Sequence, residues 1–271
     1  MNKSSYSQQT IEKSNTKTNY PPALMVKSVS KSFGGVKAIN NVSLTVDTGR
    51  SRVIIGPNGA GKTTLFNLIT GEIPLDGGEL YIFGENVTKA PIQRRSELGL
   101  ARTYQISNLF NELTVEENLY LALRGTEWKT NHLLSFFIPW FKNKAKLKNA
   151  REIAESVALD NRLNTLVSNL SHGEQRQLEL GIAIAPDPKI ILFDEPMAGL
   201  SPSERGFMRK LISRLASEKI ILAIEHDMDF ALSLTNDVTV MDQGSVLAEG
   251  TPDEIKQNEN VRTIYKLQNI E

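Results

Sequence analysis

The stretch that decides the fold is "RVIIGPNGAGKTTLF", residues 52–66. Its centre, Gly56 to Thr63, fits the pattern G-x-x-x-x-G-K-[ST], in which backbone N–H groups surround a phosphate because glycine carries no obstructing side chain. Lys62 then brings positive charge to the β- and γ-phosphates, and the Thr63 hydroxyl is a ligand for Mg²⁺. An apolar run before the pattern predicts a buried strand, and the residues after it predict a helix ending at Gly71. The residues expected to form this phosphate-binding loop are Gly56, Pro57, Asn58, Gly59, Ala60, Gly61, Lys62, Thr63 and Thr64.

Outward from this stretch, short apolar runs alternate with helical patterns. "KIILFDEP" (189–196) and "KIILAIEH" (219–226) predict buried strands, each separated from the next by an amphipathic segment. Strands alternating with helices favour an α/β fold with a mainly parallel sheet. Two other regions predict antiparallel hairpins, one turning at Gly34-Gly35 and one at Gln243-Gly244.

Two carboxylates stand where one of these buried strands ends. Asp194 and Glu195 follow "IILF", at the sheet edge where open α/β sheets bind their ligands. Asp194 at that place can hold Mg²⁺, and Glu195 can polarise a water molecule for attack on the γ-phosphate. The alternative is a solvated acidic strand end, which the phosphate-binding loop makes the weaker interpretation.

Three further residues have both a functional and an ordinary interpretation. Gln105 follows a predicted strand and could reach Mg²⁺ or the attacking water, whereas the ordinary role is a surface glutamine. His226 stands at the end of another apolar strand. It could sense the γ-phosphate, whereas its ordinary role is that of a structural hydrogen-bonding group. Phe33 precedes a glycine turn and could stack on a base or pack in the core.

The segment "LSHGE", residues 170–174, opens a helix. Ser171 and Glu174 form the pattern of a capping box, and the same spacing occurs at Thr114, Ser201 and Thr251. What distinguishes this one is Gly173 in the first turn, where glycine costs about 1 kcal/mol relative to alanine. A helix N-terminus free of side chains binds anions well. From the residues alone, a cap and a phosphate half-site remain equally supported.

Composition limits the remaining classes. Basic and acidic residues balance at 31 each, which argues against a strongly basic nucleic-acid-binding face. The absence of cysteine excludes disulfides, thiolate zinc sites and iron–sulfur clusters. Residues 1–22 are polar and predict a flexible tail. The apolar stretch 133–141 is about half the ~18 residues that span a bilayer. It either packs a helical insertion against its own helices or contacts a membrane protein or the membrane surface.

Taken together and in this order, these segments resemble the ATP-binding cassette of ABC transporters. Gly56–Thr63 resembles the Walker A loop, "LSHGE" the signature motif, and Asp194 with Glu195 the Walker B pair. The resemblance implies a Q-loop role for Gln105, a switch role for His226 and adenine stacking for Phe33. It implies ATP and Mg²⁺ as cofactors, with Thr63, Gln105 and Asp194 at the metal.

The resemblance also implies an architecture. We expect a P-loop NTPase cassette over residues 23–250, with a mainly parallel core, an antiparallel β subdomain and a helical insertion at about 109–185. A helical extension at 251–271 would follow. In that family two cassettes pair head to tail, so that Ser171, Gly173 and Glu174 would complete the ATP site of a partner.

Within the family, "GLARTYQISNLFNELTVEENL" (99–119) and "EHDM" (225–228) are most similar to the ATP-binding subunits of branched-chain amino acid importers. The implied partners are two membrane permeases, a second cassette in a heterodimer or homodimer, an extracytoplasmic solute-binding protein, and no nucleic acid. The implied location is the cytoplasmic face of the membrane. Three alternatives stay open: a urea or amide importer, a soluble ABC ATPase without a transport role, and a P-loop kinase.

Overall fold

A computed structural model describes residues 20–103, 109–125, 143–225, 228–235 and 237–268. It contains a six-stranded sheet in the order β10-β9-β3-β8-β7-β6 and a four-stranded sheet in the order β2-β1-β4-β5. In the six-stranded sheet every neighbouring pair is parallel except β10 with β9. Its strands are β3 (Arg52–Ile55), β6 (Leu100–Thr103), β7 (Ile190–Asp194), β8 (Ile220–Ile224), β9 (Val238–Asp242) and β10 (Ser245–Gly250).

The four-stranded sheet is antiparallel throughout. Its strands are β1 (Leu24–Phe33), β2 (Val36–Val46), β4 (Gly77–Ile82) and β5 (Glu85–Asn86). The predicted turn at Gly34-Gly35 joins β1 to β2, and the predicted hairpin at Gln243-Gly244 joins β9 to β10. Both residues of the second turn have positive φ, 44° and 76°, as a two-residue hairpin turn of type I′ requires.

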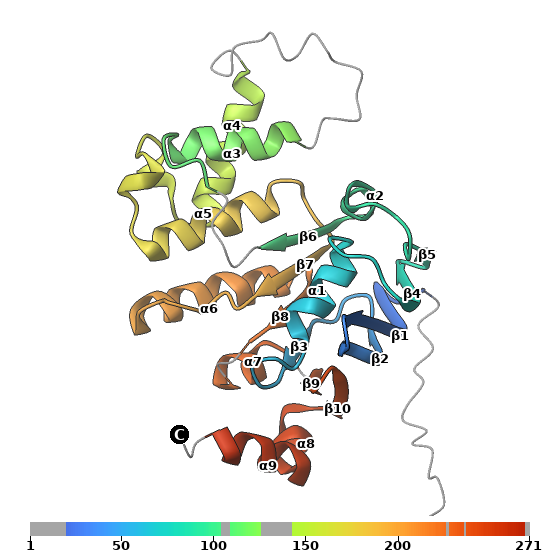
Figure 1. Ribbon diagram of the computed structural model, residues 1–271. Helices are drawn as coiled ribbons and strands as arrows, with labels where there is room; N and C mark the ends of the chain where they lie inside the picture. The colour runs from blue at the N-terminus through green and yellow to red at the C-terminus, as the bar shows by residue number, and fades with distance from the viewer. Residues whose placement is uncertain (1–19, 104–108, 126–142, 226–227, 236, 269–271) are drawn as a thin grey trace, which may run out of the picture.

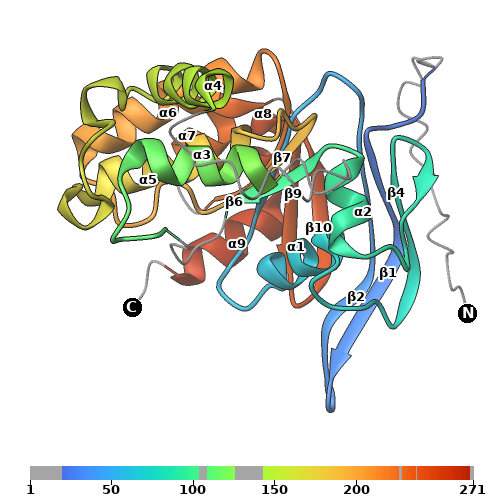
Figure 2. The same cartoon turned by 90° about the horizontal axis from the view of Figure 1, so that it is seen from above.

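Helices cover both faces of the parallel sheet. They are α1 (Lys62–Thr70), α2 (Ile92–Glu97), α3 (Val115–Gly125), α4 (Lys144–Ser156), α5 (His172–Ile184), α6 (Pro202–Ala216), α7 (Met228–Leu234), α8 (Pro252–Gln257) and α9 (Glu259–Gln268). Helices α3 to α5 group on one side of the molecule and the antiparallel sheet lies on the other (Figures 1 and 2). Helices α8 and α9, red in Figure 1, lie beyond the β9–β10 hairpin.

The parallel strands separate two hydrophobic cores because alternate side chains point to opposite faces. Ile190 and Leu192 of β7 belong to a core shared with α1 and the antiparallel sheet. Ile191 and Phe193 belong to a second core shared with α3 to α7. Helix α1 is therefore enclosed between the two sheets, and its N-terminus is fixed relative to the ends of the parallel strands.

Local capping patterns in the sequence are confirmed. The structure has capping boxes at Ser171, Ser201 and Thr251, and Thr114 exchanges the same pair of hydrogen bonds with Glu117. Helix α1 ends at Gly71, whose φ of 85° allows its N–H to bond back to the last turn. Across the described part of the chain, no helix is both long enough and apolar enough to span a membrane.

Candidate functional site

The phosphate-binding loop joins β3 to α1 and needs its glycines for close packing. A side chain at Gly56, whose φ is 152°, would overlap the carbonyl oxygen of Met241. At Gly61, with φ 97°, a Cβ would lie 2.5 Å from the carbonyl oxygen of Ala38. Neither neighbour can move easily because both are backbone atoms. Gly61 also caps α1 without a side chain, which leaves the N–H groups of the first turn open to an anion.

The turn between β9 and β10 holds this loop from the side. The Gly244 N–H donates to the carbonyl of Ala60 at 3.0 Å. The Gly244 carbonyl in turn accepts from the N–H of Asn40, on β2, at 2.8 Å. One turn residue thus links the middle of the loop to the antiparallel sheet.

The Lys62 side chain is buried and points back toward the first residues of the loop. Its Nζ donates to the carbonyl oxygens of Gly56 and Pro57 at 2.7 and 2.9 Å. Burial lowers the pKa of Lys62, and the nearby charges of Glu195 and Asp194 oppose that shift. Lys62, the loop, Asp194 and Glu195 therefore lie close to one another.

Lys62, Glu195 and loop residues 58–61 border a cavity of about 610 Å³ at the carboxyl ends of the parallel strands. Asp194 is not among its lining residues. Its lining residues are Val36, Lys37, Ala38, Asn58, Gly59, Ala60, Gly61, Lys62, Thr63, Thr64, Glu195, Gln243 and Gly244. Phe33 pairs with Val36 across the β1–β2 turn and is 51% exposed, so the alternative of a core role is wrong. Phe33 does not itself line the cavity, whereas its partner Val36 does, and Lys31 Nζ lies 5.6 Å from the centroid of the Phe33 ring. Adenine stacking stays a prediction.

Asp194 closes β7 with a fully buried side chain. Burial raises the pKa of this carboxyl group, and the hydrogen bond from Arg102, at 2.7 Å to Oδ2, opposes the rise. Oδ1 is buried and has no hydrogen-bond partner among the described residues. An orphaned buried carboxylate oxygen fits a role as a metal ligand. Mg²⁺ is ordinarily held by one or two carboxylates together with phosphate oxygens. The described residues correspondingly contain no group of three His, Asp or Glu side chains that could hold a metal alone.

Glu195 lies one residue further, in a strained backbone conformation. Its φ is 53°, a left-handed value that costs a non-glycine residue on the order of 1–2 kcal/mol. Its N–H bonds to the carbonyl of Ile224 at 3.0 Å, which fixes the sharp turn after β7. This turn places Glu195 on the cavity wall with Lys62. Strain retained at such a position is typical of functional sites.

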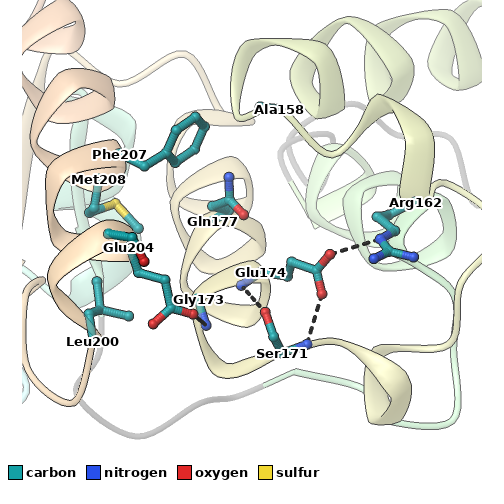
Figure 3. A pocket seen from close by; sticks show the side chains of 11 residues that line it. Ala158, Arg162, Ser171, Gly173, Glu174, Gln177, Leu200, Glu204, Phe207 and Met208 are labelled. Carbon is teal, nitrogen blue, oxygen red and sulfur yellow. Dashed lines mark hydrogen bonds and ion pairs between the residues drawn. The ribbon is translucent and has the colours of Figure 1, made fainter.

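The signature-like segment borders a separate pocket of about 550 Å³ between α5 and α6 (Figure 3). Ser171 Oγ accepts from the N–H of Glu174 at 3.2 Å, and Glu174 Oε2 accepts from the N–H of Ser171 at 2.8 Å. Glu174 Oε1 also accepts from Arg162 Nε at 2.8 Å. The predicted cap is therefore present. Among the described residues, this pocket shares no lining residue with the cavity that Lys62 and Glu195 border.

Gly173, however, does not leave the helix N-terminus bare. Glu204 Oε1, from α6, accepts the Gly173 N–H at 3.2 Å, and a Cβ on Gly173 would lie 2.7 Å from Glu204 Cδ (Figure 3). Glu204 Oε2 simultaneously accepts from Ser201 N at 2.8 Å and Ser201 Oγ at 2.6 Å. These bonds hold the pKa of Glu204 below its usual value, so an internal carboxylate occupies the anion position of α5.

Sequence reasoning missed Arg102 and the second role of Glu204. Arg102 carries a signal, because a charged residue within a buried parallel strand requires a charged partner. The Glu204–Gly173 bond spans 31 residues and has no local signal. Gln105, His226 and the stretch 133–141 lie outside the described residues.

The chain is similar in sequence to known proteins. Residues 39–198 match the family model described as "ABC transporter". The chain is 37% identical over 249 residues to the Pseudomonas aeruginosa "high-affinity branched-chain amino acid transport ATP-binding protein BraF", covering 90% of this chain and 97% of that one. With the Escherichia coli LivG protein of the same description, identity is 37% over 250 residues, with the same coverage.

Solved structures agree in fold. A nucleotide-free ATP-binding cassette from an ABC transporter superimposes with a TM-score of 0.78 at 31% identity, covering 90% of this chain and 99% of that one. The ADP conformation of the cassette MJ1267 gives a TM-score of 0.79 at 30% identity, covering 91% and 99%.

Proposed function

Since this chain belongs to the ABC transporter family of ATP-binding proteins, we propose that it energises the uptake of branched-chain amino acids through separate permease subunits. As a member of that family it is an ATPase coupled to transport. The proposed cargo is supported by relatives such as BraF and LivG, which match over nine-tenths of this chain. The alternative cargo is urea or an amide, as the sequence also allowed.

The observation that carries the catalytic proposal is the shared cavity of Lys62 and Glu195. The loop N–H groups and the start of α1 would surround the β- and γ-phosphates, and Lys62 would exchange its two backbone carbonyl partners for phosphate oxygens. Positioning and neutralisation of charge account for most of the catalysis of phosphoryl transfer, and this arrangement offers both.

Glu195 is the proposed general base. Its carboxylate borders the phosphate cavity and can accept a proton from a water molecule as that water attacks the γ-phosphate. Gln105 would orient the same water, and His226 would contact the γ-phosphate from the end of β8. Thr63, Asp194 and Gln105 are the residues proposed to hold Mg²⁺, which when bound would neutralise charge on the phosphates.

A second cassette would complete the site. Ser171, Gly173 and Glu174 border a pocket separate from the cavity that Lys62 and Glu195 border in their own chain. An ATP held by another cassette would reach the Gly173 N–H by replacing the Glu204 carboxylate there. We propose a head-to-tail heterodimer with a related cassette. Two permeases and an extracytoplasmic binding protein would make up the rest of the complex, and the chain would lie on the cytoplasmic face of the membrane.

The dimer is tested with Glu195→Gln, in which the base is lost and the phosphate contacts are kept. This variant should bind ATP, hydrolyse it at under about 1% of the wild-type rate if the base contributes 10²–10⁴-fold, and accumulate on a sizing column as a dimer with the second cassette. Normal turnover would contradict the role of Glu195. A dimer formed by the chain alone would favour a homodimer over the heterodimer.

The cargo is tested with the complex purified in detergent from its own cells and reconstituted into liposomes with the binding protein. Leucine, isoleucine or valine should stimulate ATP hydrolysis, and urea should not. Stimulation by urea alone would transfer the proposal to the alternative cargo. A chain that purifies without any membrane protein would refute the transport role.

A further inference from the structure

Arg102 is a buried cation that the proposed chemistry does not use. It lies on β6, its side chain is 5% exposed, and among the described residues its guanidinium bonds to Asp194, Asn67 and Glu72. Nη2 donates to Asp194 Oδ2 at 2.7 Å, and Nη1 donates to Asn67 Oδ1 at 2.6 Å and Glu72 Oε1 at 3.0 Å. Such a buried, multiply bonded arginine requires a fixed orientation of each partner.

The three contacts connect the two halves of the phosphate site. Asn67 lies on α1, the helix that begins with Lys62, and Glu72 follows the glycine that ends this helix. Phe66, also on α1, has its ring centroid 5.7 Å from the guanidinium carbon of Arg102. Asp194 lies at the end of β7. One side chain thus sets the position of the acidic strand end relative to the phosphate-loop helix.

The bond to Oδ2 also determines which oxygen of Asp194 is available. Because Arg102 occupies Oδ2, the buried oxygen that has no partner among the described residues is Oδ1. A carboxylate that ligates a metal is ordinarily oriented by a hydrogen bond to its other oxygen, and removing such an outer partner costs about 10- to 100-fold in metal affinity.

We propose that Arg102 is a positioning residue for the magnesium site, which orients Asp194 through Oδ2 and leaves Oδ1 for the cation. The inference rests on the magnesium site of the proposed function. It differs from two simpler roles. If Arg102 were only a structural ion pair, its loss would weaken folding and nucleotide binding alike. If its guanidinium competed with Mg²⁺ for Asp194, its loss would strengthen Mg²⁺ binding.

The test measures nucleotide binding separately from its dependence on Mg²⁺. A fluorescent ADP analogue is titrated into the full chain with EDTA, and Mg²⁺ is then titrated into the complex. For Arg102→Met, affinity in EDTA should stay within about twofold of wild type, because the loop and Lys62 are intact. The Mg²⁺ midpoint should rise about 10- to 100-fold.

Two variants control for charge and folding. Glu72→Gln removes the more exposed ion-pair partner of Arg102 and keeps the Asp194 contact, so its Mg²⁺ midpoint should match wild type. Arg102→Lys keeps the charge but not the fork-like geometry, and should give an intermediate midpoint. If Arg102→Met does not fold, the comparison of Arg102→Lys with Glu72→Gln decides the question.

An unchanged midpoint in Arg102→Met, a lower midpoint, or a parallel loss of affinity in EDTA would each overturn the proposal. So would a shift in Glu72→Gln equal to that of Arg102→Met. If the wild-type protein itself shows no effect of Mg²⁺ on nucleotide binding, the magnesium site of the proposed function fails. If wild type responds and Arg102→Met matches it, only the role of Arg102 fails.

Discussion

The contact between Gly173 and Glu204 makes the effect of Gly173→Ala depend on a residue of another helix. In an unobstructed helical position, alanine is about 1 kcal/mol more favourable than glycine. Here the new Cβ would lie 2.7 Å from Glu204 Cδ and displace that carboxylate. Displacement breaks the hydrogen bonds from Ser201 to Glu204 Oε2, which are one half of the capping box and worth about 1 kcal/mol, and the bond to the buried Gly173 N–H, worth about 1–3 kcal/mol. The free energy of unfolding should therefore fall by about 1–3 kcal/mol.

A double-mutant cycle isolates this effect. In a Glu204→Ala background the obstruction is gone, so Gly173→Ala should raise the free energy of unfolding by up to about 1 kcal/mol. The sign of the same substitution reverses, with a coupling of about 2–4 kcal/mol. The assay is equilibrium urea unfolding without nucleotide.

Gly206→Ala is the matched control for that cycle. Gly206 lies in α6, exposed, where an added Cβ would meet no atom of the described residues within 4 Å, so the substitution should stabilise the protein by about 1 kcal/mol. If Gly173→Ala behaves like Gly206→Ala in the wild-type background, Glu204 does not determine the need for glycine at position 173. The same conclusion follows if the effects of Gly173→Ala and Glu204→Ala on the free energy of unfolding are additive.

Three other predictions concern the phosphate loop and the C-terminal helix. Lys62→Ala should weaken ATP binding about 10- to 100-fold, since charged hydrogen bonds are worth about 1.5–3 kcal/mol; retained affinity in a calorimetric titration would contradict the contact. Gly61→Ala should lower the unfolding temperature more than Gly59→Ala, because both have positive φ but only the first would meet backbone atoms; equal losses would refute this. Burial raises the pKa of Tyr265, on α9, from 10.0 to about 12. The unfolded chain thus loses this proton first, and the tyrosine's contribution to stability is complete below pH 10 and declines up to about pH 12. Tyr265→Phe should show a smaller decline than wild type in unfolding experiments across that range, and identical declines would exclude the shift.

Features that depend on neighbouring residues were predictable from the sequence. The capping box of Ser171 joins residues three apart, and the turn at Gln243-Gly244 needs only two residues able to adopt positive φ. The buried strand before Asp194 follows from its unbroken apolar run. In each case one short segment determines its own hydrogen bonds.

Contacts between distant segments were not predictable in the same way. Arg102 and Asp194 are 92 residues apart, and their bond depends on β6 pairing with β7 in a particular register. The sequence indicates that Arg102 needs a partner and does not identify it. Likewise, the capping spacing at Ser201 accounts for one oxygen of Glu204, whereas the packing of α6 beside α5 determines what the other oxygen binds.

The turn at Gly244 has a consequence for protein engineering. Surface hairpin turns usually tolerate insertions, tags and new chain ends. Here the N–H and the carbonyl of one turn residue bond to Ala60 and Asn40, from segments about two hundred positions earlier. Lengthening this turn by a single residue would release the phosphate loop on one side and β2 on the other. A fusion or permutation site is therefore better chosen elsewhere, and a split protein cut at this point would lose affinity for nucleotide before it lost its fold.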